Sequence, residues 1–167
     1  MSDLVELSEL RVRRERWVDA PPQLVYDLIS DIGASADWTP DLVSASYEAD
    51  GVPRAGSWFT AVNADVRHDR EWVTRSRVQV AEPGREFAWY VVVQGVDATL
   101  WRYRLRPQDG GTLVTEDWQV EHLFPVMGES REELLGLKAH NTAGMAATLD
   151  SLARTAASRA GRPPQAG

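Results

Sequence analysis

Residues 130–157 read SREELLGLKAHNTAGMAATLDSLARTAA, and this stretch predicts a long helix. Ser130 and Glu133 have the spacing of a capping box, in which each side chain accepts a hydrogen bond from the other's backbone N–H. Residues of one face then recur at helical spacing as far as about Ala157. The members of this stripe are Leu134, Lys138, Thr142, Met145, Leu149, Leu152 and Ala156. The stripe is less apolar in its first half, but it still needs a partner surface to cover it.

That partner surface is predicted to be a sheet formed by the preceding residues. Six strand-like runs come before the helix, separated by strong turn formers such as Pro83-Gly84 and Asp109-Gly110-Gly111. The runs span roughly 42–49, 57–65, 69–82, 85–94, 98–107 and 112–123. Short connections between consecutive strands predict hairpins, and so an antiparallel meander.

The start of the chain adds one strand and two short helices. An extended run at 11–19 comes before Pro21-Pro22, and apolar residues at helical spacing follow as far as Ile32. A second short helical segment is expected to end by Pro40. The predicted fold is therefore α+β, with a seven-stranded antiparallel sheet that curves around the C-terminal helix. We expect one domain over 11–157, a loose segment at 1–10 and a disordered tail at 158–167.

Alternation along the strands predicts which side chains face the helix. The covered face carries large aromatic residues, which come from four of the runs. They are Trp72, Trp89, Trp101, Tyr103 and Trp118. For 57–65 the alternation does not choose between Trp58, Thr60 and Val62 on one side and Phe59, Ala61 and Asn63 on the other.

The same face also carries polar side chains, among them Ser76, Glu116 and His122. A buried carboxylate without a partner costs several kcal/mol or becomes neutral. A dry core does not normally accept Glu116, so we predict a cavity that holds water or ligand between sheet and helix. Asn141 and Thr142 on the helix are expected to border this cavity.

Several segments resemble the SRPBCC superfamily, which includes START-type lipid carriers and polyketide aromatase/cyclases. They are Val18 to Asp31, Trp38-Thr-Pro40, Glu71-Trp-Val73, Gly111 to Trp118 and His140 to Leu149. The resemblance covers about 12–157 and implies a helix-grip fold with a deep cavity. Such cyclases often carry an inward arginine at the position that Ser76 occupies here, and the alternation directs Arg75 and Arg77 outward.

Two functions are open at this point. The first is binding of a hydrophobic or aromatic small molecule, lipid-like or polyketide-like. Its predicted contacts are Trp38, Trp72, Ser76, Trp89, Trp101, Trp118, His122, Thr142 and Met145. The second is a cyclase or dehydratase in which Glu116 is the acid or base, helped by Tyr103 and Asn141. A weaker third option is a stress or toxin-antitoxin partner module.

Composition and motifs exclude other classes. The net charge of −7 disfavours nucleic acid as a partner, and Arg102, Arg104 and Arg106 are expected to form a solvated strand face. The chain has no cysteine, no spacing typical of a metal site and no nucleotide-binding motif, so we expect neither metal nor cofactor. It also lacks a signal-peptide pattern and an apolar run of the ~20 residues that span a bilayer, which favours a cytoplasmic protein.

Overall fold

The computed structural model describes residues 5–65 and 69–162 and confirms the predicted element order. The strands form one antiparallel sheet in the order β1-β7-β6-β5-β4-β3-β2. They are β1 (Arg11–Val18), β2 (Leu42–Tyr47), β3 (Trp58–Asp65), β4 (Arg70–Glu82), β5 (Glu86–Val93), β6 (Val96–Gln108) and β7 (Gly111–Val120). The helices are α1 (Pro22–Ser30) and α2 (Arg131–Arg159), with 3₁₀ turns η1 (Leu7–Glu9), η2 (Ile32–Asp37) and η3 (Pro125–Met127).

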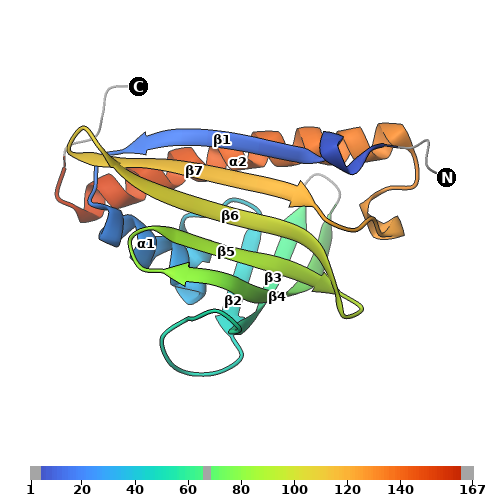
Figure 1. Ribbon diagram of the computed structural model, residues 1–167, viewed down its shortest axis with the longest axis horizontal. Helices are drawn as coiled ribbons and strands as arrows, with labels where there is room; N and C mark the ends of the chain where they lie inside the picture. Colours follow the sequence, from blue (N-terminus) through green and yellow to red (C-terminus); the bar gives the residue numbers. More distant parts are fainter. Residues whose placement is uncertain (1–4, 66–68, 163–167) are drawn as a thin grey trace.

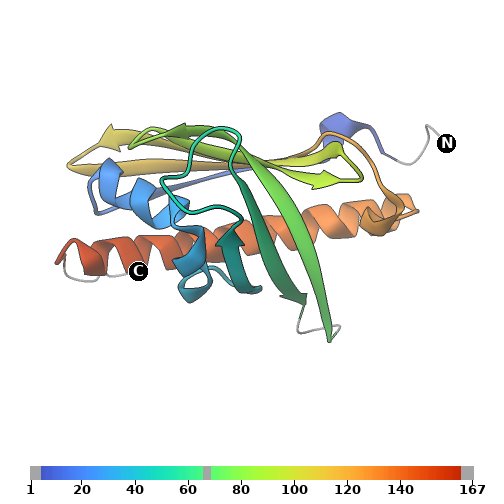
Figure 2. The same cartoon turned by 90° about the horizontal axis from the view of Figure 1, so that it is seen from below.

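The sheet curves, and all the helices that cover it lie on its concave side (Figures 1 and 2). The long helix α2 runs along β1 and β7, while α1 crosses the ends of β5, β6 and β7. The turn η2 packs on β2. Because α2 follows one edge of the sheet, the middle strands depend on other side chains for their cover.

The capping box begins α2 as predicted. The Ser130 hydroxyl accepts a hydrogen bond from the Glu133 N–H at 3.1 Å, and the Glu133 carboxylate accepts one from the Ser130 N–H at 3.2 Å. The side chains of α2 that are fully buried are Leu134, Met145, Thr148, Leu149, Leu152, Ala153, Ala156 and Ala157. None of them lies within 135–144, so the first half of the helix is packed more loosely than the second.

The core is divided into two clusters along α2. The larger joins α1 and the second half of α2 to the sheet, and it includes Phe87, Tyr103, Val114 and Leu149. The smaller lies near the start of α2 and includes Leu10, Trp118, Leu134 and Met145. Val114 and Trp118 therefore belong to different clusters, and Glu116 lies between them on the same face of β7.

Strand pairing decides the inward face of β3, which alternation alone left open. Phe59 pairs with Ser76 and Ala61 with Thr74, and both Phe59 and Ala61 are buried. A bulge between Val78 and Val80 also reverses the alternation at the end of β4, so that Ala81 lies opposite Phe87. The extension of the inward face to Val80 was therefore wrong, because one extra residue shifts all that follow to the other face.

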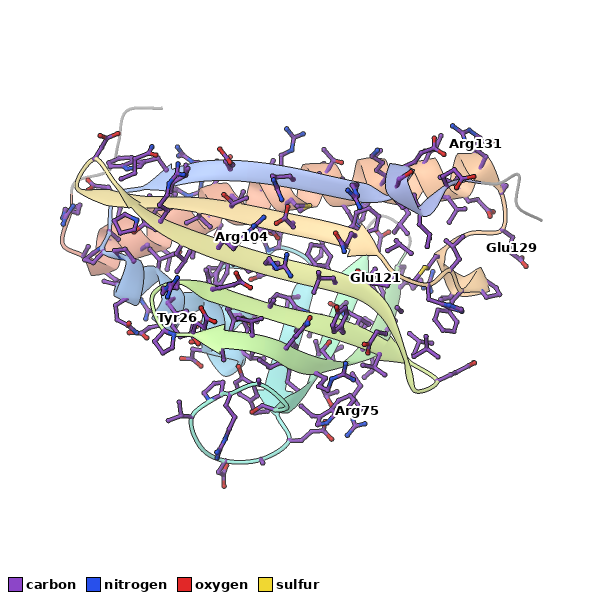
Figure 3. The ribbon with its side chains drawn as sticks, in the orientation of Figure 1. Tyr26, Arg75, Arg104, Glu121, Glu129 and Arg131 are labelled. Atoms are coloured by element: carbon purple, nitrogen blue, oxygen red, sulfur yellow. The ribbon has the colours of Figure 1, made fainter. Side chains whose placement is uncertain are left out.

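The described part of the N-terminal segment is packed, in contrast to the prediction that residues 1–10 are loose. Val5 and Leu10 are 8% and 0% exposed and belong to the smaller core cluster. Glu9 forms an ion pair with Arg131 at 2.9 Å, which attaches η1 to the start of α2 (Figure 3). Helix α2 continues to Arg159, and residues 1–4 and 163–167 of the two predicted terminal segments lie outside the described residues.

Candidate ligand-binding site on the concave face

A row of aromatic rings crosses the concave face of β5, β6 and β7. Trp89 lies opposite Trp101, with ring centroids 6.5 Å apart and planes 18° apart. Trp101 lies opposite Trp118 at 6.4 Å, and Trp89 also stacks on Tyr103 at 6.0 Å. Residues at paired positions on neighbouring strands have side chains in contact, so the register of three strands builds this row.

The row is only partly covered by the helices. Trp118 is 2% exposed, whereas Trp89 and Trp101 are half-buried. Trp101 packs against the smaller core cluster, as do Leu123, Met127 and Leu137, and all four are only partly buried. The partly covered end of the aromatic row thus lies in the cluster that holds the start of α2.

Trp72 does not belong to this row, which corrects the prediction that it lies on a covered surface. It is 37% exposed, and the guanidinium of Arg70 lies 5.5 Å from its ring centroid. Trp72 pairs with Asn63 near the tip of the β3–β4 hairpin, which extends past α2 (Figure 2). Its side chain points to the predicted face of the sheet, but none of the described helices reaches that end of the sheet.

Glu116 lies between the two core clusters and is 2% exposed. The Tyr103 hydroxyl, directly opposite on β6, donates a hydrogen bond to Oε1 of Glu116 at 3.0 Å. The other carboxyl oxygen, Oε2, is buried and has no partner among the described residues. A buried polar atom without a hydrogen bond costs ~1–3 kcal/mol, so this arrangement is unfavourable unless something else satisfies it.

Burial raises the pKa of Glu116 to about 8. The hydrogen bond from Tyr103 lowers this pKa, and the nearby charge of Asp117 raises it, by smaller amounts than burial. Burial also raises the pKa of Tyr103 well above its ordinary value, and the Glu116 carboxyl adds to that effect. At neutral pH the pair is therefore uncharged, with Glu116 in its acid form.

Three other buried polar atoms lack a hydrogen bond among the described residues, but two of them have an ionic partner. They are Nε of Arg16, Nε of Arg102 and Nε1 of Trp38. The Arg16 nitrogen lies 3.2 Å from Asp150, and the Arg102 nitrogen lies 3.5 Å from Glu86. These contacts miss the hydrogen-bond angle but satisfy the charge. Oε2 of Glu116 and Nε1 of Trp38 therefore remain without a hydrogen-bond or ionic partner among the described residues.

The helix side of the site consists of Met145, Thr148, Asn141 and Thr142. Met145 is buried, as expected of a residue on the inner stripe, while Asn141 and Thr142 are half-buried. The Thr142 hydroxyl donates to the carbonyl of Lys138 at 2.7 Å, so its own helix satisfies it. Thr148, 8% exposed, was missed by the sequence analysis, although it follows Met145 at helical spacing and is the polar group most buried on this helix.

Ser76 is 1% exposed on the concave face of β4, where the resemblance placed an inward arginine. Arg75 and Arg77 do point to the other face, as alternation predicts, and pair there with Glu48 and Asp97 at 2.9 Å. Figure 3 labels Arg75 on the sheet surface turned away from α2. The concave face of β4 therefore offers a hydroxyl group in place of a guanidinium.

His122 lies outside the site, which corrects its assignment to the concave face. Strand β7 ends at Val120, so alternation no longer applies two residues later. His122 is exposed and packs on Phe124 with ring centroids 4.8 Å apart.

Two hollows stand out among the described residues, and neither is lined by Glu116 or the stacked tryptophans. One, of about 240 Å³, is enclosed by the loop between β2 and β3. The other, of about 250 Å³, is lined by Trp38 on one side and by α1 and Arg159 on the other. Trp38, predicted to contact ligand, is thus 6% exposed at the α1 end of the core and apart from the tryptophan row. Neither hollow is the predicted cavity between the sheet and α2.

Two of the arginines of β6, Arg102 and Arg104, are paired with carboxylates on the convex face, whereas Arg106 is exposed and donates a hydrogen bond to Gln108. Arg104 lies 2.9 Å from Asp117, which Arg13 also contacts at 2.6 Å, and Arg102 lies close to Glu86. Figure 3 shows Arg104 on this surface. The described residues contain no group of three acidic or histidine side chains suited to a metal ion. None of the described helices is long and apolar enough to cross a bilayer.

Comparison with known proteins places this geometry in a family. The family model described as "Polyketide cyclase / dehydrase and lipid transport" matches residues 9–157. The chain belongs to this family. Its fold is accordingly that of the START-like SRPBCC superfamily, with the sheet gripping a C-terminal helix.

Solved structures agree. The chain is 30% identical to a Polyketide_cyc-like protein from Corynebacterium glutamicum, covering 87% of this chain and 90% of that one with a TM-score of 0.62. It shares its fold with a START superfamily protein from Mycobacterium smegmatis (19% identity, 87% and 98% covered, TM-score 0.66). It also resembles half of the di-domain aromatase/cyclase StfQ of the steffimycin biosynthetic pathway (16% identity, 91% and 52% covered, TM-score 0.72). No curated protein matched the sequence.

Proposed function

We propose that the protein binds a hydrophobic or aromatic small molecule between the concave face of the sheet and the first half of α2. The observation that carries this proposal is the row of stacked rings that the helix leaves partly uncovered. Burial of a large aromatic side chain is favourable by a few kcal/mol. Trp89 and Trp101 are only half-buried, so a molecule that covers their rings gains the remaining part of that free energy on binding. The family, which includes lipid transport, supports the same reading.

A ligand must first separate α2 from the sheet, because Glu116 and Trp118 are almost fully buried. Three features favour separation at the first half of the helix. Residues 135–144 contain no fully buried side chain, and a Cβ atom added at Gly136 or Gly144 would meet nothing within 4 Å. Met127, whose unbranched side chain adapts easily, is one of the partly buried residues that pack against the smaller cluster there.

Replacement of one indole tests the proposal. We expect Trp101→Ala to weaken binding of the neutral fluorescent probe N-phenyl-1-naphthylamine about tenfold, because it removes half of the stacked surface. Trp58→Ala is the matched control, since Trp58 lies on the convex face with Arg75 stacked 3.9 Å from its ring centroid. Titration by probe fluorescence measures both. Equal affinity of the Trp101 variant and the wild type would contradict the proposal.

A second candidate, the cyclase or dehydratase, is favoured by the pKa of Glu116, about 8. An acid whose pKa lies near the working pH transfers protons efficiently in both directions. In this proposal the Glu116 carboxylate removes the α-proton of a ketone, and Asn141 hydrogen-bonds the resulting enolate. Glu116 then returns that proton to the attacked carbonyl oxygen in ring closure, or to the hydroxyl group that leaves as water, while Tyr103 holds its other oxygen. It is supported by the burial of Glu116 and by the family.

The catalytic role is tested with a linear poly-β-ketone thioester and mass spectrometry. Loss of water or ring closure by the wild type, and its loss in Glu116→Gln with probe binding retained, is the expected result. Glu121→Gln changes an exposed carboxylate one residue beyond the same strand and is the control. No turnover by the wild type would leave ligand binding as the function.

A further inference from the structure

The hydrogen-bond inventory of the Glu116–Tyr103 pair indicates what kind of ligand this site selects. When the pair is uncharged it holds two O–H groups, one on the acid and one on the phenol. If Tyr103 donates to Oε1 at 3.0 Å, the acid proton remains on Oε2, which has no partner among the described residues. If the acid donates to the phenol oxygen instead, the phenol proton remains free. In either arrangement one donor is left over.

We propose that the Glu116–Tyr103 pair offers this free O–H to the ligand, and so selects apolar molecules that carry a neutral oxygen acceptor such as a ketone, ester or ether. This inference rests on the proposed binding function and names the chemistry of its ligand. The oxygen acceptor relieves a buried group that is unsatisfied without it, and that relief offsets part of the cost of separating α2 from the sheet. A pure hydrocarbon leaves the group unsatisfied.

The charged side chains next to Glu116 do not compete with the ligand as acceptors of this hydrogen bond. On β7 the next residue, Asp117, faces the convex side, where Arg13 and Arg104 hold it. On β1 the register partner is Arg14, whose side chain is exposed.

From α2, Met145 and Leu149 belong to the two core clusters on either side of Glu116, and neither they nor the buried Thr148 titrates. The hydrogen bond between Tyr103 and Glu116 therefore decides which of their two O–H groups is left for the ligand.

The site should therefore lose its preference for ligands with an oxygen acceptor at high pH. Once Glu116 ionises, Tyr103 keeps its bond to the carboxylate, and the remaining oxygen is an acceptor only. A ketone oxygen placed against it is then repelled. The preference for acceptor ligands should fall as pH rises through about 8, the pKa that burial gives Glu116.

The test compares 2-acetylnaphthalene with 2-ethylnaphthalene, which have similar shapes but differ by one carbonyl oxygen. We expect the ketone to bind about 3- to 10-fold more tightly at pH 6.5, the worth of one neutral hydrogen bond, and the ratio to approach one at pH 9.5. Tryptophan fluorescence and calorimetry report both affinities. In Glu116→Gln, whose amide keeps a donor and cannot ionise, the preference should persist at both pH values. In the double variant Glu116→Leu/Tyr103→Phe, which has neither O–H group, it should vanish.

The outcomes separate the two proposals. Equal affinities for both naphthalenes in the wild type at pH 6.5 overturn the acceptor inference and leave apolar binding standing. A preference that persists in the double variant Glu116→Leu/Tyr103→Phe also overturns it, because the donor then lies elsewhere. Failure of the wild type to bind either compound overturns both proposals together.

Discussion

At the scale of single residues, the feature that needs explanation is the free-energy cost of burying Glu116. The carboxyl group is almost fully buried between two apolar clusters, with one oxygen bound by Tyr103 and the other unsatisfied. Substitution of such a group by an uncharged one of the same shape is often neutral or stabilising. A side chain that lowers stability at such a position is typical of a functional site.

The pH dependence of stability measures that cost. Between the ordinary pKa of 4.5 and about 8, the folded protein keeps a proton on Glu116 that the unfolded chain has released. The free energy of unfolding therefore falls as pH rises through this window. We expect Glu116→Gln to remove this fall and to exceed the wild type by roughly 3 kcal/mol at pH 8.5, with little difference at pH 4.5.

Urea denaturation at the two pH values checks this expectation. Glu121→Gln should keep the slope of the wild type, because that carboxylate is exposed. A Glu116→Gln protein whose stability falls with pH as steeply as the wild type would show that another group is responsible.

At the scale of the elements, α2 divides into two halves with different roles. The half from Met145 onward has closely spaced buried side chains, several of them alanine, which allow close packing against β1 and α1. The first half has one fully buried residue, Leu134, followed by ten positions without another. The capping box, the Glu9–Arg131 ion pair and Leu10 attach its start.

Gly144 lies at the junction of the two halves. A Cβ at this position meets no atom within 4 Å, so Gly144→Ala should raise the free energy of unfolding by about 1 kcal/mol through helix propensity alone. Gly111→Ala is the contrasting variant, because its Cβ would collide with the carbonyl oxygen of Val18 and lie 2.8 Å from the Trp17 ring. That variant should lose roughly 1–3 kcal/mol. Denaturant titration compares the two, and destabilisation by Gly144→Ala would contradict the open space around it.

At the scale of the whole molecule, the curved sheet is gripped firmly at one end and loosely at the other. The larger cluster unites α1, the sheet and the second half of α2, whereas the smaller cluster relies on the N-terminal segment and on partly buried side chains around Trp101. Regions with few buried apolar contacts open locally at lower free energy than the rest. The uneven packing gives the molecule a side on which it can open without unfolding.

Hydrogen exchange should detect this asymmetry. We expect backbone amides of 135–144 to exchange on the order of tenfold faster than those of 145–157, and to slow when 2-acetylnaphthalene is added. Mass spectrometry of peptides from α2 measures both effects. Uniform protection along the helix, with or without the ketone, would show that α2 does not open in halves.

Much of the architecture follows from spacing along the chain. Period-two alternation assigned Trp89, Trp101, Tyr103, Glu116 and Trp118 to one face, and the helical stripe with its capping box located α2, because these patterns depend only on local backbone geometry. Alternation could not choose a face for 57–65, since both sets of side chains there are comparably apolar. The pairing of β3 with β4 made that choice.

Contacts between distant residues required the folded chain. The bond from Tyr103 to Glu116 exists because β6 and β7 pair in one register, and the exposure of Trp72 depends on how far α2 extends beneath the sheet. His122 is not part of the site, because β7 ends two residues before it. Local patterns record which way a side chain points, whereas register, strand length and helix position decide what it meets, since these depend on interactions among residues far apart in the chain.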